Sequence, residues 1–238
     1  MPHSLTLAIL AVDEEIGLKS TYKSNKKILV QLGIDHEIFI VNDGSIDQTG
    51  KIADEIQEQD SSVKVFHNVR TMGMGFGYKQ GLKHSTKGYY MYTGAYSPIK
   101  EESIIRILEC LGKTDLIIAY IENMADRRSS RVLWSYRFTY FMRWVTGLDL
   151  KYFNGLSTCR TKYLRSIKIR SNGYTFSAEG VFKLIKFEKC DFQEVGILVN
   201  KRKRESLRIF KLSNYINVVK FLLLLWYDNC TFKASTRR

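Results

Sequence analysis

Three short polar segments follow apolar runs in the first half of the chain, and their residue types suit ligand binding. Residues 12–15 read Val-Asp-Glu-Glu, residues 41–49 read Val-Asn-Asp-Gly-Ser-Ile-Asp-Gln-Thr, and residues 73–77 read Gly-Met-Gly-Phe-Gly. In an open parallel sheet, ligands bind beyond the carboxyl ends of the strands. We therefore expect a ligand site where these three segments meet.

The second segment carries the strongest signal. Asn42 and Asp43 offer donors and acceptors for the edge of a base or a ribose, and Gly44 permits a tight turn into a helix. The alternative is an Asx turn that caps this helix. The glycine run is less specific, because a dinucleotide-binding loop should follow the first strand and Tyr78 stands where its last glycine belongs. Close packing of a helix on the sheet is the favoured interpretation of that run.

The elements that must position these segments alternate between short apolar runs and segments of helical period. This pattern is typical of parallel strands joined by crossover helices, and it predicts an α/β fold. The expected strands are residues 5–12, 36–41, 63–66, 89–92 and 116–120. Apolar residues share one face over residues 52–56 and 104–111, as in helices lying on a sheet. Beyond residue 130 we expect an aromatic-rich helix over residues 132–146 and then a mixed region to residue 199.

Composition favours one domain followed by a basic tail. The 238 residues are 45% hydrophobic, which is ample for one α/β core. The net charge is +13, and residues 201–238 hold ten Lys or Arg against two acids, a net +8. Such a tail suits nucleic acid, an anionic membrane surface or substrate phosphates. Nucleic acid is disfavoured, because no recognised module and no interleaved exposed aromatic residues accompany the charge.

The C-terminal segment, residues 211–238, reads as a basic amphipathic helix and tail. Val219, Leu222, Leu223 and Trp226 recur at helical spacing and suit either the membrane interface or docking on the sheet. The apolar run at residues 221–226 is far shorter than the roughly 20 residues of a membrane span. The N-terminus lacks a signal-peptide pattern, and the four widely spaced cysteines indicate reduced thiols. We therefore expect a cytoplasmic protein, with peripheral membrane contact through this segment as a further expectation.

Several pieces in a fixed order give the chain a family resemblance. They are A-V-D-E-E (11–15), V-N-D-G-S-I-D-Q-T (41–49), G-M-G-F-G-Y-K-Q-G-L (73–82), D-L-I-I-A-Y (115–120), R-R-S-S-R (127–131), G-L-D-L-K-Y-F-N-G (147–155), S-A-E-G-V-F-K-L-I (177–185) and E-V-G-I-L-V-N-K-R (194–202). Over residues 5–214 the chain resembles inverting family 2 glycosyltransferases, and within them the dolichol-phosphate mannosyltransferase-like branch. The resemblance implies a GT-A fold with a mostly parallel central sheet flanked by helices. It also implies a catalytic domain over residues 1–210.

The resemblance implies roles for residues at matching positions. Val12, Glu14, Asn42 and Asp43 correspond to the positions that hold the nucleoside of a nucleotide-diphosphate sugar. Arg202 stands where the family contacts the donor diphosphate, which a planar guanidinium can grip through two oxygens.

Two further positions have competing interpretations. Arg131, with Arg128, is expected near the same phosphates, and the alternative is a solvated helix face. Glu179 corresponds to a carboxylate on the acceptor side and is the candidate catalytic base or orienting group. Its alternative is an acid that faces the dipole at a helix N-terminus.

One departure from the family concerns the metal. The family places an acid cluster after the fourth strand, where it binds a divalent cation, Mg²⁺ or Mn²⁺. Here residues 92–98 read Tyr-Thr-Gly-Ala-Tyr-Ser-Pro, so Ala95 occupies the usual acidic position. A hard cation usually needs at least one carboxylate. Three accounts stay open: other groups hold the metal together with the diphosphate, cationic side chains replace it, or sugar transfer is lost.

The resemblance implies transfer of a sugar, with inversion, from a GDP- or UDP-sugar to a polyprenyl phosphate or a glycan. The alternative is a non-catalytic nucleotide-sugar-binding or scaffold protein that has lost the metal centre.

Overall fold

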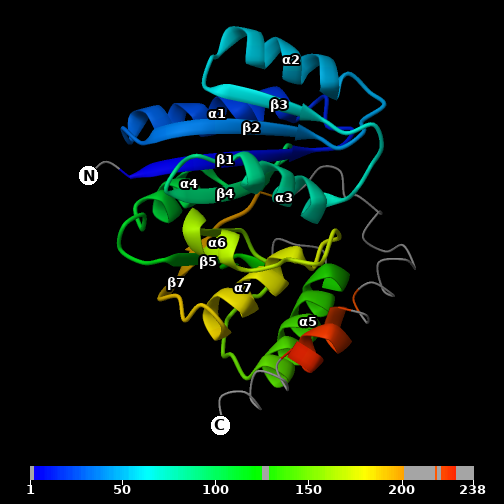
Figure 1. The fold of residues 1–238 in the computed structure, drawn as a ribbon, viewed down its shortest axis with the longest axis vertical. Coiled ribbons are helices and arrows are strands. Elements are labelled where there is room, and N and C mark those ends of the chain that lie inside the picture. The colour runs from blue at the N-terminus through cyan, green and yellow to red at the C-terminus, as the bar shows by residue number, and fades with distance from the viewer. Residues whose placement is uncertain (1–2, 125–128, 201–217, 219–220, 229–238) are drawn as a thin grey trace.

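The chain folds around one seven-stranded sheet with the strand order β3-β2-β1-β4-β6-β5-β7 (Figure 1). The computed structural model describes residues 3–124, 129–200, 218 and 221–228, with only the backbone of residues 129–131. The strands are β1 (Ser4–Ala11), β2 (Asp35–Asn42), β3 (Val63–His67), β4 (Tyr89–Gly94), β5 (Leu116–Ile121), β6 (Ser157–Arg160) and β7 (Phe192–Ile197). All neighbouring strands pair in parallel except β6, which is antiparallel to both β4 and β5.

Helices cover both faces of the sheet, because the strands are apolar on both faces. The helices are α1 (Leu18–Gln31), α2 (Thr49–Gln59), α3 (Met74–His84), α4 (Glu101–Leu108), α5 (Ser129–Thr146), α6 (Thr161–Ser166) and α7 (Phe176–Lys186), and a short helix spans residues 221–228. In β1, Leu5, Leu7 and Ile9 point into the core shared with α1, α2 and α4, whereas Ala8 and Leu10 point into the core shared with α3, α5 and α7. This alternation follows from the two-residue period of a strand.

The five strands expected from apolar runs are all present, with ends that differ by at most two residues. The helices expected around residues 52–56, 104–111 and 132–146 are α2, α4 and α5. The mixed region to residue 199 resolves into β6, α6, α7 and β7. Strand β6 could not be foreseen, since Ser157–Arg160 has only four residues and no apolar run.

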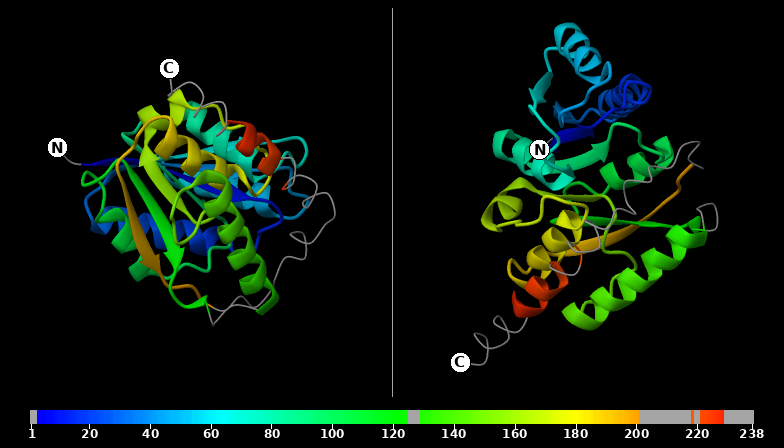
Figure 2. Two further views of the ribbon diagram at one scale, coloured as in Figure 1. Left: turned by 90° about the horizontal axis from the view of Figure 1, so that it is seen from below. Right: turned by 90° about the vertical axis from the view of Figure 1, so that its right-hand side faces the viewer.

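The helix over residues 221–228 docks beside α7 (Figure 2). Phe221 and Leu225, one turn apart, are 6% and 0% exposed, and Asp228 pairs with Arg170 and with Lys183 (3.9 Å). From the sequence, Trp226 is expected on the apolar face of this helix. In the structure Trp226 is 54% exposed, and the buried face carries Phe221 and Leu225 instead. The expected domain boundary near residue 210 lies outside the described residues.

Among the described residues, no helix has both the length and the hydropathy needed to cross a bilayer.

Replacing Leu225 with Ala tests this docking. We expect a loss of about 2–5 kcal/mol in the free energy of unfolding, because a fully buried leucine leaves a cavity when it is truncated. Urea unfolding measures the change. Leu223→Ala is the matched control, because Leu223 is 63% exposed on the same helix and its truncation should cost less than about 0.5 kcal/mol. Equal effects of the two substitutions would contradict the docking.

Candidate functional site

The carboxyl ends of four parallel strands meet at one edge of the sheet. Ala11 pairs with Asn42, Asn42 pairs with His67, and Leu10 pairs with Gly94. Neighbouring strands lie about 4.8 Å apart, so the loops that follow β1, β2, β3 and β4 are adjacent. Strand β5 runs parallel to β4, because β6 is antiparallel to both, and it ends at the same edge. The three polar segments found in the sequence therefore share one side of the molecule.

The loops after β1 and β2 brace one another through backbone N–H groups that donate to side chains of the opposite loop. These bonds join Asp13 N to Ser45 Oγ (3.0 Å), Glu14 N to Thr49 Oγ1 (2.8 Å), Glu15 N to Asp47 Oδ2 (3.2 Å), Ile46 N to Asp13 Oδ1 (3.0 Å) and Gln48 N to Glu15 Oε2 (3.0 Å). Val12 and Glu14 are partly exposed beside this brace. Two of the positions predicted to hold a nucleoside thus lie on a stiff, accessible rim.

Asn42 is buried at the end of β2 and serves the turn that follows it. Its Oδ1 accepts the Ser45 N–H (3.2 Å), and its Nδ2 lies 3.0 Å from His67 Nδ1. His67 Nε2 in turn lies 2.9 Å from Asp54 Oδ1. The Ser45 contact holds the turn after β2, but α2 begins only at Thr49 with Gln48 as its N-cap residue, so Asn42 does not cap this helix as the alternative expected. These contacts do not test whether Asn42 also touches a nucleoside.

Asp43 is a buried clamp on the loop after β3. Its Oδ1 accepts Asn68 Nδ2 (2.8 Å) and the Met72 N–H (2.9 Å), and its Oδ2 accepts the Gly73 N–H (2.7 Å). Asp43 is only 7% exposed, so water competes little for these hydrogen bonds. The carboxylate that the sequence assigned to a nucleoside is thus engaged in holding the third loop.

Two glycines permit the close approach that this clamp requires. Gly44 has φ +69°, and a Cβ there would lie 2.4 Å from the carbonyl carbon of Arg70. Gly75, in the first turn of α3, would meet the carbonyl oxygen of Ser171 at 2.5 Å. A Cβ at Gly77 would meet side-chain atoms of Val41 and Leu10 on the sheet at 3.3 and 3.4 Å, which agrees with the close packing of α3 on the sheet favoured from the sequence.

Glu179 lies in the first turn of α7 and is 2% exposed. It accepts the N–H groups of Arg170 (3.0 Å) and Ser171 (2.9 Å) and pairs with Lys183 Nζ at 2.6 Å. Burial alone would raise the pKa of this carboxyl, but the Lys183 hydrogen bond and the two backbone donors lower it below its usual value. A carboxylate so fully supplied with donors suits the orienting role better than that of a base.

The remaining predicted residues are placed as follows. Arg131 belongs to α5, but its side chain is not among those described. Arg202 and Arg128 lie outside the described residues.

Ala95 occupies the position where the family carries its acid cluster, and its surroundings do not suit a cation. It is 1% exposed, its N–H donates to the carbonyl of Leu10 (2.9 Å), and its carbonyl accepts Thr21 Oγ1 (2.7 Å). Across the described part of the chain, no three His, Cys, Asp or Glu side chains gather as they would around a metal. The residues described here therefore do not fit the divalent cation that the resemblance implies.

A cavity of about 250 Å³ opens beside the end of β5, beneath α5. Its lining includes Tyr120, Ser135, Arg143 and Lys151, and the Lys151 ammonium sits 4.2 Å from the centre of the Tyr120 ring. Among the described residues, Ser135 Oγ is buried without a hydrogen-bond partner. The sequence did not single out these residues, although Tyr120 ends the D-L-I-I-A-Y segment, Lys151 lies in the G-L-D-L-K-Y-F-N-G segment, and Ser135 and Arg143 lie between R-R-S-S-R and that segment.

Replacing Asp43 with Asn tests the clamp. The substitution keeps the shape but removes the charge and one acceptor, so we expect a loss of about 1–3 kcal/mol in the free energy of unfolding. We also expect faster hydrogen exchange at the Met72 and Gly73 amides. Asp35→Asn is the control, because Asp35 is exposed and pairs with Lys87 at the surface. Unchanged exchange at both amides would contradict the clamp.

The lowered pKa of Glu179 predicts a pH dependence of stability. A carboxyl whose folded pKa lies below its unfolded value stabilises the fold above about pH 4.5, its usual value, and this contribution is lost as the pH falls through the folded pKa. Glu179→Gln should therefore cost about 3 kcal/mol at neutral pH and progressively less in acid, because it leaves Lys183 without its buried carboxylate. Urea unfolding of both forms across pH measures this. A constant difference between them would contradict the assignment.

Comparison with known proteins identifies the family. Residues 7–166 match the family described as Glycosyl transferase family 2. An undecaprenyl-phosphate mannosyltransferase of Micrococcus luteus is 28% identical over 169 residues, covering 65% of this chain and 68% of that protein. A teichoic acid poly(glycerol phosphate) polymerase of Staphylococcus epidermidis is 28% identical over 127 residues, which cover 53% of this chain and 17% of the polymerase.

Solved structures share the fold at low sequence identity. The glucosyl-3-phosphoglycerate synthase of Mycobacterium tuberculosis, in complex with Mn²⁺, UDP-glucose and phosphoglyceric acid, aligns with a TM-score of 0.71 and 16% identity, over 94% of this chain and 80% of the synthase. The same synthase with Mg²⁺ and UDP gives a TM-score of 0.69. This likeness confirms the α/β GT-A fold predicted from the sequence. With the family match over two thirds of its length, the chain belongs to glycosyl transferase family 2.

Proposed function

We propose that this protein transfers a sugar from a nucleoside diphosphate sugar, UDP- or GDP-linked, to a polyprenyl phosphate with inversion at the anomeric carbon. The observation that carries the proposal is the convergence of the loops after β1 and β2, with Val12, Glu14, Asn42 and Asp43, at the edge of a family 2 sheet. The relative in Micrococcus luteus is named for transfer to undecaprenyl phosphate, and the synthase of similar fold binds UDP-glucose.

The hydrogen bonds and burial of Glu179 favour a polyprenyl phosphate over a sugar hydroxyl as the acceptor. A hydroxyl must lose its proton to a base as it attacks, whereas a polyprenyl phosphate is already ionised. Glu179, the candidate base, is buried and accepts hydrogen bonds from two backbone groups and Lys183. The cavity beside β5 adds two cationic side chains, Arg143 and Lys151, that suit an anionic acceptor.

In the proposed reaction, the acceptor oxygen attacks the anomeric carbon in line with the departing nucleoside diphosphate. The bond from the anomeric carbon to the diphosphate breaks as the new bond forms, and the leaving group carries the electron pair. The developing charge on the diphosphate must be stabilised by fixed positive groups. Arg131 and Arg202 are the proposed groups, on the strength of their places in the family pattern.

A donor screen tests binding. A ligand that binds only the folded state raises its stability by about 2.7 kcal/mol at one hundred times its Kd, which shifts the melting temperature by several degrees. We expect such a shift with UDP- or GDP-sugars, and a smaller one in Asn42→Ala. Asp35→Asn, far from the site edge, should respond like the unaltered protein. Absence of any shift across both nucleotide classes would contradict the nucleotide site.

The second candidate is a nucleotide-sugar-binding protein without transferase activity, and Ala95 in place of the acid favours it. Incubation with labelled donor and undecaprenyl phosphate, with and without Mn²⁺, separates the two. Labelled lipid extracted into organic solvent would establish transfer to the polyprenyl phosphate. Donor binding without labelled product on lipid or glycan acceptors would favour the binding protein.

The acceptor proposed here lies in a membrane, and the basic segment 211–238 was expected to contact one. Most of that segment lies outside the described residues, so its part in membrane contact stays a prediction.

A further inference from the structure

Helix α5 is apolar on two opposite sides. Its inner side carries Met142 and Val145, which are 0% and 6% exposed in the core against α7. Its outer side carries large side chains that face away from the core: Leu133, Trp134, Tyr140, Phe141 and Trp144. Leu133, Tyr140 and Trp144 recur at helical spacing, and the last two are 77% and 72% exposed. We call this outer side the aromatic face.

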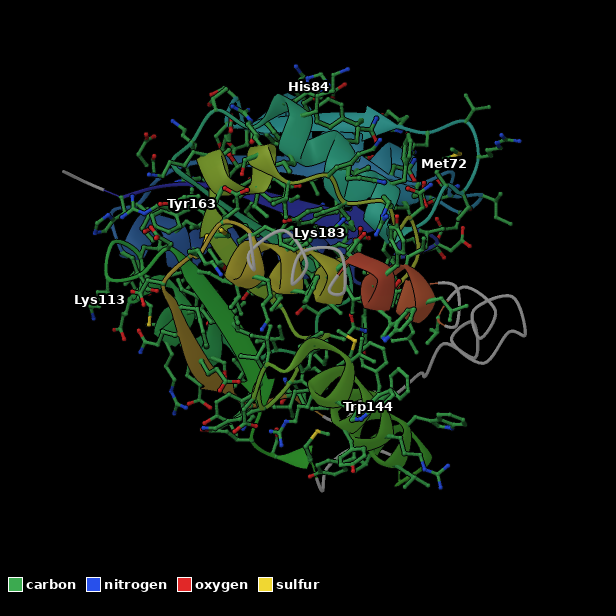
Figure 3. The ribbon with its side chains drawn as sticks, turned by 60° about the horizontal axis from the view of Figure 1, so that its bottom comes forward. Met72, His84, Lys113, Trp144, Tyr163 and Lys183 are labelled. Carbon is green, nitrogen blue, oxygen red and sulfur yellow. The ribbon has the colours of Figure 1, made fainter. Side chains whose placement is uncertain are left out.

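A second helix at the same end of the molecule also exposes apolar side chains. The helix over residues 221–228 exposes Leu223 and Trp226 while it buries Phe221 and Leu225. Both helices lie at the end of the molecule opposite α2, next to α7, and Trp144 projects from α5 there (Figure 3). The three tryptophans of the chain, Trp134 and Trp144 on α5 and Trp226 on the second helix, are each about half exposed or more.

A solvated helix in a folded protein normally places charged and polar residues opposite its buried stripe. A contiguous exposed apolar surface instead marks a site of contact with a protein or a membrane. The aromatic face therefore has the character of a docking surface.

Charge and composition favour an anionic lipid surface as the occupant. The 18 residues of α5 include Arg131, Arg137 and Arg143 and no acid. Arg137 holds its guanidinium 5.9 Å from the centre of the Trp134 ring, and Asp149, close by in sequence, is paired with Arg143 at 3.3 Å. Trp and Tyr on a basic helix are the residues that settle at the headgroup level of a bilayer.

A second copy of the chain fits this surface less well. Two identical subunits usually associate through the same patch on each. Such a contact would place the exposed Arg137 of each copy in the same interface, and like charges across an interface are costly. A negatively charged bilayer has no such conflict.

We propose that the aromatic face of α5 docks the protein on an anionic membrane surface. Helix α5 would lie in the plane of the headgroups with Tyr140 and Trp144 inserted and Arg137 among the lipid phosphates. This inference concerns docking alone and holds whether or not the protein transfers sugar.

The tryptophans report directly on docking. We expect the emission of the full chain to shift to shorter wavelength, and iodide quenching to fall, when vesicles of equimolar phosphatidylcholine and phosphatidylglycerol are added. Vesicles of phosphatidylcholine alone should bind ~10-fold more weakly, because each basic residue near an anionic surface adds affinity. Unchanged emission and quenching with the mixed vesicles would overturn the proposal.

Substitution separates the face from the rest of the surface. Tyr140→Ser with Trp144→Ser should lower the partition onto mixed vesicles by at least ~10-fold in co-sedimentation, because two inserted aromatic side chains are lost. Val30→Ser is the matched control, since Val30 is 59% exposed on α1, away from the aromatic face. Circular dichroism checks that the variants fold, and the iodide measurement on the unaltered chain stands if they do not.

Two outcomes of these experiments would reject the lipid. Equal pelleting of the double variant and the unaltered chain would show that the aromatic face is not the docking surface. A dimer in sedimentation velocity that the double variant dissolves, without any vesicle response of the unaltered chain, would assign the face to a second copy.

Discussion

The buried carboxylate of Asp43 is the contact on which the site edge depends. The carboxylate joins the end of β2 to the loop before α3 by accepting the Met72 and Gly73 amides. The backbone N–H of Asp43 donates to the carbonyl of Ala11 at the end of β1. The constraint extends further, because Gly75 N donates to the carbonyl of Asn172 (2.8 Å). The neighbouring residues 170 and 171 are held in turn by Glu179. Two buried carboxylates therefore fix the loops around the strand ends, one from each half of the chain.

The first half of the fold could be predicted because its strands are buried on both faces and read as apolar runs. The positions of Asn42 and Asp43 at a strand end followed from the same pattern. Their partners could not be predicted, since the Asp43 bonds go to backbone N–H groups of Met72 and Gly73, which any residue type would offer. The second half was harder to predict from the sequence, because β6 has only four residues and pairs antiparallel between two strands that run parallel to each other. Nothing in the residue types of β6 indicates which strands lie on either side of it.

The site combines a family framework with an altered centre. Ala95 sits where a carboxylate would be expected, and the position is tightly integrated, with its peptide bonded to β1 and to Thr21 of α1. Its carbonyl and N–H are engaged and its side chain is a methyl group, so this residue contributes no group to a diphosphate. In the proposed function, positive side chains elsewhere balance the charge of the donor. The family pattern assigns that role to arginines, and the cavity on the β5 side supplies Arg143 and Lys151 for the acceptor.

Helix α5 forms one wall of that cavity through Ser135 and Arg143, and the aromatic face lies across the helix, whose width is about 10 Å. An ordinary amphipathic helix does not rotate about its axis, because rotation would bury its polar side chains. Helix α5 has apolar side chains on both sides, so this penalty restrains it less. Polar bonds near its end also hold its orientation, such as Arg143 Nε to the carbonyl of Leu150 (2.9 Å) and to Asp149 Oδ1 (3.3 Å) beyond the helix. A small rotation of α5 about its axis would move Ser135 and Arg143 and change the shape of the cavity that they line. A molecule that contacts the aromatic face would therefore also affect the width of the cavity.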